Sequence, residues 1–594
     1  MKTPTIGTMS TSFAQYIVHT LEGLGVKRIY GLVGDSLNPL SDAVRGSEIE
    51  WIHVRNEEAA AFAAAADSLT TGELAVCGAS CGPGNTHLIQ GLYEAHRDRA
   101  RVLAIASHIP SAEIGSEFFQ ATHPEYVFQE CSGYREVVHS PTQGARVLHN
   151  ALQSTYSGGG VSVMVIPGDV FSADAPESST AQSTFARGDG RRVFPDPGEA
   201  AALVDAINTA KNVTLFCGYG ARDAREEVFA LAEKIKAPIG HSFRGKMFIA
   251  HDNPYDVGMS GLLGYGACHE ASLEADLFIM VGTDFPYSDW LPKGNVAQID
   301  LDGSHIGRRT PVTYPVIGDV KSVLENILPH VEEKADRSFL DRMLARHAEL
   351  LEHVVEKYTT PAAEARTPIH PEFAASVIDE LIADDAFVTV DTGMCNVWSS
   401  RYLTPNGTRG ELASYLHGTM ANALPMAIGV QAAHPDRQVV SWSGDGGLGM
   451  LLGELLTVAL HNLPVKIVVF NNSSLGMVKL EMIVQGFPDF GTDHEHVNYA
   501  AIAEAVGIAA FRVEDPAQLR EAVSEALAAD GPALIDVVTD PNALSLPPDI
   551  TAEMLQGFTA TGVKTVLEGG VGKMVELARR NLRQIGAAAA IEVK

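Results

Sequence analysis

Short apolar segments alternate with amphipathic or Ala-rich stretches along the first third of the chain. Apolar runs of about four to eight residues flanked by turn residues predict strands, and longer periodic stretches predict helices. Strands are therefore expected at residues 28–33, 51–54, 74–79, 102–106 and 161–166, and helices at 12–24, 57–69 and 88–97. Repeated strand–loop–helix units predict a parallel sheet covered by helices on both faces.

The same alternation occurs twice more, after two linkers. The linkers are predicted at 172–198, which is rich in Ser, Ala, Pro, Asp and Gly, and at 359–371, which holds three prolines. Between them, strands are predicted at 213–217, 277–281 and 296–301, followed by a charged helical stretch at 321–357. After them, strands are predicted at 387–390, 439–443, 466–471 and 533–538, with a helix at 450–461. The sequence thus predicts three successive α/β domains with parallel sheets, at 1–185, 190–345 and 365–545, and a tail at 546–594.

Composition narrows the class of protein. The 594 residues carry a formal net charge of −30, which argues against nucleic acid as a partner. Hydrophobic residues make up 46% of the chain, so global disorder is excluded. We expect neither a membrane-spanning helix, which needs about 18 consecutive apolar residues, nor a secretory signal. The six cysteines do not form a disulfide pattern, and reduced thiols are expected in a cytoplasmic protein.

The strongest chemical signal lies in the third domain. Asp445 stands in Gly444-Asp445-Gly446, directly after a predicted strand, and Asn472 follows 27 residues later at the end of the next strand. Right-handed crossovers bring both side chains to the carboxyl edge of one sheet, where open α/β sheets bind ligands. A carboxylate, an amide oxygen and a nearby carbonyl suit Mg²⁺, which keeps coordination positions for phosphates. A lone Gly-Asp-Gly is more often a simple turn, but the paired strands favour a magnesium–diphosphate site.

This Gly-Asp-Gly-Gly…Asn-Asn arrangement resembles the diphosphate-binding motif of thiamine-diphosphate enzymes. Six further segments extend the resemblance to the bacterial pyruvate:quinone oxidoreductases (pyruvate oxidases) of that family. They are GVKRIYGLVGDSLN, ELAVCGASCGPGNTHLIQGLYEAHR, LAIASHIPSAEIGS, NPYDVGMSGLLG, GTDFPYSDWLP and HGTMANALPMAIG. The resemblance implies the thiamine-diphosphate-binding fold, with pyrimidine and diphosphate domains flanking an FAD-binding domain, and the cofactors thiamine diphosphate, FAD and Mg²⁺.

Glu57 follows a strand and opens a predicted helix, where acidic residues are favourable for electrostatic reasons alone. In the family, the matching glutamate hydrogen-bonds N1′ of the thiamine pyrimidine and takes part in its activation. The resemblance therefore implies that Glu57 is a catalytic acid–base residue. The commoner family pattern has His before this glutamate, whereas this chain has Asn56, so an ionisable neighbour is expected to be lost.

The resemblance implies the other site residues by position. The thiamine diphosphate site is expected to comprise Gly418, Thr419, Met420, Asp445, Gly446, Gly447, Asn472, Ser473, Ser474, Leu475, Gly476, Met477 and Val478, with Asp445, Asn472 and the Ser474 carbonyl on Mg²⁺. Met420 is expected under the bent cofactor, although ordinary core packing explains a methionine equally well. Phe119, Gln120 and Met477 are expected in the catalytic centre. For Phe119 and Gln120 the alternative is a loop that packs on its own domain, and Met477 replaces a phenylalanine of close relatives.

The middle domain is expected to bind FAD. The matching residues are Ser260, Gly261, Leu262, Leu263, Thr283, Asp284, Phe285, Pro286, Tyr287 and Asp300. Asp300 ends a strand, where a carboxylate can accept a hydrogen bond from a ribose hydroxyl. Gly218-Tyr219-Gly220 also follows a strand but predicts no more than a turn by itself.

Residues 571–594 differ from the acidic remainder of the chain, because they carry five basic and two acidic side chains. Apolar residues recur there at helical spacing and predict a basic amphipathic helix. Such a helix either lies on an anionic membrane surface, as the resemblance implies, or packs on its own protein.

The resemblance implies oxidative decarboxylation of pyruvate to acetate and CO₂, with electrons passing through FAD to a membrane quinone. It also implies a homo-oligomer, with a tetramer expected, attached peripherally to the inner face of the cell membrane. Acetolactate synthesis, phosphate-dependent pyruvate oxidation and a catalytically silent homologue remain alternatives.

Overall fold

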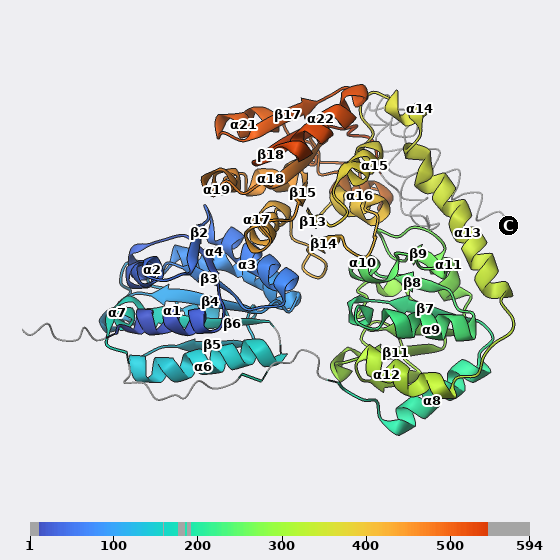
Figure 1. Ribbon diagram of the computed structural model, residues 1–594, viewed down its shortest axis with the longest axis horizontal. Coiled ribbons are helices and arrows are strands. Elements are labelled where there is room, and N and C mark those ends of the chain that lie inside the picture. Colours follow the sequence, from blue (N-terminus) through green and yellow to red (C-terminus); the bar gives the residue numbers. More distant parts are fainter. Residues whose placement is uncertain (1–10, 159, 176–184, 187–191, 545–594) are drawn as a thin grey trace, which may run out of the picture.

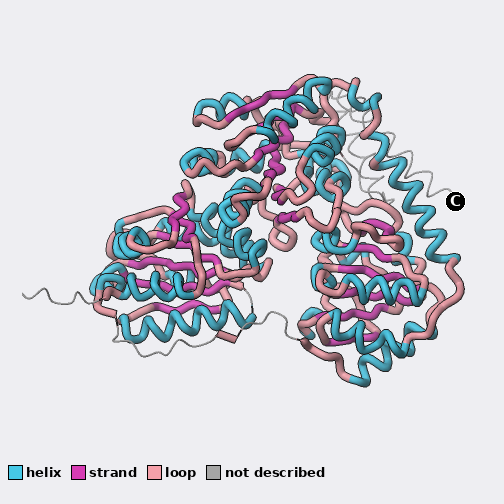
Figure 2. The backbone as a smooth tube through the Cα atoms, viewed as in Figure 1, coloured by secondary structure: helices cyan, strands magenta, loops and turns pink. Residues whose placement is uncertain are grey.

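Three six-stranded sheets follow one another along the chain (Figure 1), and in each of them every strand pair is parallel. The computed structural model describes residues 11–158, 160–175, 185–186 and 192–544. Figure 2 shows the strands of each sheet between layers of helices. The predicted fold class, three α/β domains with parallel sheets, is confirmed. The tail and its expected membrane helix lie outside the described residues.

The strands of the first sheet are β1 (Arg28–Gly31), β2 (Glu50–His53), β3 (Ala75–Ala79), β4 (Val102–His108), β5 (Tyr134–Val137) and β6 (Val161–Pro167). The second contains β7 (Val213–Cys217), β8 (Ile239–His241), β9 (Asp256–Met259), β10 (Leu277–Val281), β11 (Val296–Asp300) and β12 (Tyr314–Ile317). The third contains β13 (Phe387–Val390), β14 (Gly410–Ala413), β15 (Val439–Gly444), β16 (Lys466–Asn471), β17 (Ala509–Val513) and β18 (Ala533–Val538). The central strands are buried along their whole length, as expected for sheets covered on both faces.

Helices connect the strands. The first domain contains α1 (Phe13–Gly23), α2 (Asn38–Arg45), α3 (Glu57–Thr71), α4 (Pro83–Arg97), α5 (Pro124–Val127), α6 (Pro141–Gly158) and α7 (Gly168–Ser172). The central domain contains α8 (Pro197–Thr209), α9 (Arg225–Ile235), α10 (Lys246–Ile249), α11 (Cys268–Leu273), α12 (Val320–Ile327) and α13 (Ser338–Val354). The third contains α14 (Pro361–Glu364), α15 (Pro371–Leu381), α16 (Met394–Tyr402), α17 (Ala423–Ala433), α18 (Asp445–Met450), α19 (Glu454–Leu460), α20 (Gly476–Val484), α21 (Tyr499–Ala505) and α22 (Pro516–Ala528).

The first and third sheets have the same topology. Their strand orders are β2-β1-β3-β4-β6-β5 and β14-β13-β15-β16-β18-β17. Helices α3 and α17 occupy equivalent places in the two domains and pack against each other. Their backbones nearly touch, because a Cβ on Gly429 would lie 2.0 Å from the carbonyl oxygen of Ala63. A buried, Ala-rich α3 thus joins the two domains.

A polar junction links all three domains. Arg244 of the central domain pairs with Asp98 at the end of α4, with 3.1 Å between Nη1 and Oδ1. On the same helix, Glu94 accepts a hydrogen bond from Ser414 of the third domain. Burial raises the pKa of Glu94 to about 9, and the carboxyl of Asp98 adds to this effect. The C-terminal end of α4 therefore contacts both the central and the third domain.

Several predicted elements differ from the structure. The helix predicted at 450–461 is divided, because residues 451–453 form a turn between α18 and α19 in a glycine-rich stretch. The stretch predicted at 321–357 is two helices, α12 and α13, and Pro329 follows the first. Both predicted linkers contain helical residues, since α8 begins at Pro197 and α14 lies within 359–371.

The six cysteines are all unpaired thiols in buried positions, as predicted. Among the described residues, no helix is both long enough and apolar enough to cross a membrane.

Candidate functional site

The carboxyl edge of the third sheet gathers polar side chains from three neighbouring strands. Asp391 follows β13, Asp445 follows β15 and Asn472 follows β16. The strand order reverses between β13 and β15, and ligands of open α/β sheets bind at such a switch point. The predicted meeting of Asp445 and Asn472 at one sheet edge therefore agrees with the structure.

Asp445 is 3% exposed and its carboxylate is held from several sides. Oδ2 accepts the backbone N–H of Ser473 at 2.5 Å and lies 3.2 Å from Nε2 of His494, while Oδ1 accepts the N–H of Gly446. Burial raises the pKa of the Asp445 carboxyl, and these hydrogen bonds oppose the increase. A buried carboxyl of this kind is stabilised as an anion when a cation lies beside it.

Two glycines after Asp445 leave no space for side chains. A Cβ on Gly447 would lie 1.9 Å from Oδ2 of Asp391, and a Cβ on Gly446 would lie 2.8 Å from Cδ2 of Leu475. Burial raises the pKa of Asp391 to about 7. Packing against Asp391 and Leu475 therefore requires glycine at both positions. We call this turn the glycine cradle, and it lies at the sheet edge where the diphosphate is expected.

The turn after β16 provides the other oxygen atoms. Oδ1 of Asn472 accepts the N–H of Ser474, and Ser473 adopts a left-handed φ of 52° to turn the chain. Among the described residues, no three His, Cys, Asp or Glu side chains are placed to bind a metal. A metal at this edge would therefore depend on Asp445 together with amide and carbonyl oxygens, the donor set that Mg²⁺ accepts.

Glu57 is the first residue of α3, and it is 4% exposed. Its Oε2 lies 2.9 Å from Nδ1 of His87 on α4, and a Cβ on Gly84 would lie 2.9 Å from its Oε1. Asn56 caps the helix by accepting the N–H of Glu58. The neighbour in sequence, Asn56, is not ionisable, as predicted, but His87 on α4 places an ionisable group beside Glu57.

The segment before Glu57 is fixed by the third domain. Glu454, the first residue of α19, accepts the backbone N–H groups of Arg55 and Asn56 and the hydroxyl of Thr457. Burial raises the pKa of Glu454 to about 7. We call the surroundings of Glu57 in the first domain and of Asp445 in the third the two half-sites. The hydrogen bonds of Glu454 fix the segment before Glu57 to the third domain, which also carries Asp445.

Thr419 and Met420 also lie between the two domains. Nε2 of Gln90, one turn beyond His87 on α4, donates to Oγ1 of Thr419 at 2.7 Å. Cε of Met420 lies 3.5 Å from the position of a Cβ on Gly446. Helix α4 therefore contacts residues of both half-sites, and Met420 borders the glycine cradle. Its role under the cofactor stays a prediction.

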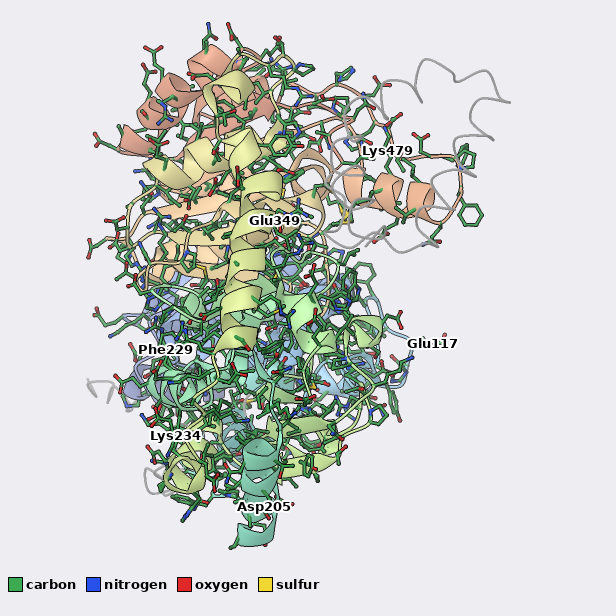
Figure 3. All side chains as sticks on the ribbon, turned by 90° about the vertical axis from the view of Figure 1, so that its right-hand side faces the viewer. Glu117, Asp205, Phe229, Lys234, Glu349 and Lys479 are labelled. Atoms are coloured by element: carbon green, nitrogen blue, oxygen red, sulfur yellow. The ribbon has the colours of Figure 1, made fainter. Side chains whose placement is uncertain are left out.

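The remaining predicted residues lie in a loop of the first domain and at the start of α20. Phe119 is 77% exposed, and Gln120, with a φ of 62°, packs on Gly82. Met477 lies at the start of α20 and packs against the hydrophobic core of the third domain, whereas Val478 is 38% exposed. In Figure 3, the labelled residues Lys479 of α20 and Glu117 of the 114–122 loop lie along the same edge of the molecule.

The central sheet has its own switch point, between β7 and β10. There the turns after both strands cross closely. A Cβ on Gly220 would lie 2.8 Å from Cα of Gly282, and a Cβ on Gly218 would lie 2.4 Å from Cβ of Thr283. The Gly218–Gly220 segment, which the sequence alone predicts to be only a turn, therefore lies where nucleotides bind in such sheets.

Other predicted FAD residues lie in the same domain. Gly261, with a φ of 100°, lies against the rings of Phe285 and Tyr287, and Oγ of the buried Ser260 has no hydrogen-bond partner. Asp300 ends β11 and lies 3.3 Å from Nδ1 of His305. An unpaired buried hydroxyl beside a glycine cradle fits a polar ligand such as a nucleotide.

Sequence reasoning did not identify Asp391, His87, Glu454 or His494. Asp391 directly follows a predicted strand, so the same edge argument that found Asp445 could have found it. His87 lies within one of the segments that carry the family resemblance, and Glu454 lies shortly after the glycine motif, but only the fold shows that these side chains and His494 contact the predicted site residues.

Three family models match successive parts of the chain. Residues 11–131 match the thiamine pyrophosphate enzyme N-terminal TPP-binding domain, residues 200–327 the central domain, and residues 391–537 the C-terminal TPP-binding domain.

Curated relatives match nearly the whole chain. A putative thiamine pyrophosphate-containing protein, YdaP, of Bacillus subtilis (strain 168) is 34% identical over 96% of this chain and 99% of its own. Pyruvate oxidase of Lactiplantibacillus plantarum is 28% identical, over 88% of this chain and 87% of its own. The large subunit of acetolactate synthase isozyme 1 of Escherichia coli (strain K12) is 29% identical, over 90% of this chain and 96% of its own.

Proposed function

The chain belongs to the thiamine pyrophosphate enzyme family, and from this premise we propose that it oxidises pyruvate to acetate and CO₂. The overall reaction is pyruvate + quinone + H₂O → acetate + CO₂ + quinol. The observation that carries the proposal is the combination of two half-sites suited to thiamine diphosphate with a glycine crossing suited to a nucleotide. That combination supports a flavin-dependent oxidoreductase of the family.

Each half-site has a distinct task in this proposal. Oxygen atoms of Asp445, Asn472 and Ser474 hold Mg²⁺ and through it the diphosphate, and the glycine turn lets the main chain approach the phosphates. When bound, thiamine diphosphate takes up the charge left on pyruvate as CO₂ departs, and FAD takes up the two electrons. Glu57 holds and moves a proton at the aminopyrimidine, and His87 orients its carboxyl.

A second copy of the chain completes the site in this proposal. Glu57 and Asp445 lie in different domains of one chain, and both domains expose apolar side chains. Val33 is 50% exposed and Phe119 77% in the first domain, and Met450 is 62% exposed in the third. Apolar surface of this kind is typical of interfaces. A homodimer is the minimum, and we propose a tetramer.

We further propose a cytoplasmic enzyme that binds the inner face of the cell membrane through residues 571–594. The basic, amphipathic sequence of that segment supports this. Removal of the residues after Gly570 should abolish binding to anionic liposomes and any stimulation by lipid. Unchanged liposome binding by the shortened protein would contradict the membrane role.

One anaerobic experiment tests the reaction. Purified protein is mixed with thiamine diphosphate, Mg²⁺ and pyruvate, and the visible absorbance of the flavin is recorded. Bleaching that a soluble quinone reverses, with acetate as the product, is the expected result.

Other outcomes point to the alternatives. Pyruvate consumption with an oxidised flavin and acetolactate as product would indicate a carboligase, and acetyl phosphate formed with oxygen and phosphate would indicate the phosphate-dependent oxidase. No consumption would indicate a silent homologue.

A further inference from the structure

A short segment after α20 crosses the turn that carries the predicted magnesium ligands. The N–H of Leu475 donates to the carbonyl of Thr492 at 2.8 Å, and the N–H of His494 donates to the carbonyl of Ser473 at 3.0 Å. Ser474 and Asp493 form an antiparallel bridge between these bonds. Backbone pairing therefore fixes residues 492–494 beside the cradle, although they are far from it in sequence.

Side chains strengthen this pairing. Oδ1 of Asp493 accepts Oγ of Ser474 at 3.1 Å and Nζ of Lys479 at 3.3 Å. Nδ1 of His496 lies 2.7 Å from Oγ of Ser473. The segment thus brings two imidazoles to the turn, and they have different partners.

His494 is the imidazole that reaches the centre of the site. Its Nε2 lies 3.2 Å from Oδ2 of Asp445, and because an ionised carboxylate only accepts hydrogen bonds, Nε2 is the donor. Its Cε1 lies 3.5 Å from the position of a Cβ on Gly446, at the same distance as Cε of Met420. The His494 side chain is 32% exposed, so part of the ring is accessible to solvent.

We propose that His494 is a diphosphate-binding residue. Its Nε2–H, which donates to Asp445 in this structure, would turn to a phosphate oxygen of thiamine diphosphate once Mg²⁺ occupies that carboxylate. The inference rests on the proposed binding of that cofactor. A Mg²⁺ ion held by Asp445 would leave coordination positions for phosphate oxygens and water, so anionic oxygens would lie beside this carboxylate. A nitrogen donor already in contact with the same carboxylate is adjacent to them, and hydrogen bonds to charged oxygens are among the stronger ones.

A purely positioning role makes a different prediction. If His494 only orients Asp445, its loss weakens Mg²⁺ binding, and a saturating Mg²⁺ concentration restores the affinity for thiamine diphosphate. A direct contact with phosphate is lost whatever the Mg²⁺ concentration. The informative quantity is therefore the dissociation constant of thiamine diphosphate at saturating Mg²⁺.

The experiment is isothermal titration of the full-length apoprotein with thiamine diphosphate, at Mg²⁺ concentrations raised until the constant no longer changes. Three variants are compared. His494→Ala removes the donor, His494→Gln retains an N–H of similar reach, and His496→Ala is the matched control two residues away. Thermal unfolding of each variant verifies that it is folded.

We expect His494→Ala to weaken binding about 10- to 100-fold at saturating Mg²⁺, which is the scale of one hydrogen bond to a charged group. His494→Gln should recover most of this loss, and His496→Ala should change the constant less than about threefold. If the affinity of His494→Ala for thiamine diphosphate lies within twofold of that of the unaltered protein, the role of His494 is overturned but the proposed function is not. Equal losses in His494→Ala and His496→Ala would also overturn it, and failure of the unaltered protein to bind would overturn the proposed function as well.

Discussion

The contact between α3 and α17 predicts that adding one methyl group at Gly429 destabilises the protein. The Cβ of Gly429→Ala would lie 2.0 Å from the carbonyl oxygen of Ala63 and 2.7 Å from its Cα. Ordinary contacts of a Cβ begin near 3.4 Å, so the two helices would have to separate locally by more than 1 Å. The obstacle is main chain and cannot rotate away.

The magnitude follows from two opposing effects. Overpacking of this kind costs about 1–3 kcal/mol, and a backbone obstacle favours the upper value. Alanine in place of glycine inside a helix contributes about 1 kcal/mol in the other direction. We therefore expect a net loss of about 2 kcal/mol, equivalent to a decrease in Tm of ~4–8 °C for a cooperative unit of 150–250 residues.

Thermal unfolding of the full-length protein measures this change. The matched control is Gly23→Ala, since Gly23 is the last residue of α1 and has nothing within 4 Å of the added Cβ. Its Tm should be unchanged or slightly raised. A Tm of Gly429→Ala equal to or above that of the unaltered protein would refute the close packing of the two helices.

Three further substitutions probe the site. Glu57→Gln should slow flavin reduction by pyruvate about 10²- to 10⁴-fold while FAD stays bound; near-normal bleaching in the anaerobic cuvette would contradict its role. Asp445→Ala should weaken binding of thiamine diphosphate at fixed Mg²⁺ at least tenfold, by roughly 1.4 kcal/mol or more, and an unchanged titration curve would count against the ligand assignment. Burial raises the pKa of Glu454 from 4.5 in the unfolded chain to about 7. The folded protein therefore binds this proton more tightly than the unfolded chain. As the pH rises from 4.5 to 7, the free energy of unfolding should decrease by at most ~3 kcal/mol. Glu454→Gln should remove this decline, so its Tm should rise relative to the unaltered protein between pH 4.5 and 7.5; a constant difference would argue against the raised pKa.

The sequence predicted the interior of each sheet better than its edges. The buried strands β7, β10 and β16 were predicted at their observed bounds, because strands covered on both faces are continuous apolar runs. The edge strands β5, β9, β12, β14 and β17 were not predicted. Several of them carry polar or small residues on one face, and their pairing depends on a neighbour that lies elsewhere in the sequence.

The same distinction applies to the site. Asp445 and Asn472 could be placed together because successive parallel strands fix where their ends lie. His87, Glu454 and His494 contact the site only through the packing of α4, α19 and the 492–494 segment, which local patterns do not specify. The roles of the FAD residues and of the tail stay predictions.

Because the first and third sheets share a topology, the contact between α3 and α17 joins equivalent surfaces of the two domains, as an isologous interface does. Helix α3 follows β2 and precedes β3, and α17 follows β14 and precedes β15, so each helix packs on its counterpart, as in a twofold homodimer. Two copies of one fold thus present two different carboxyl edges, one with a buried glutamate and one with an aspartate in a glycine turn. A substitution at the contact between α3 and α17 affects both domains at once. A larger side chain on one helix therefore requires a smaller one on the other.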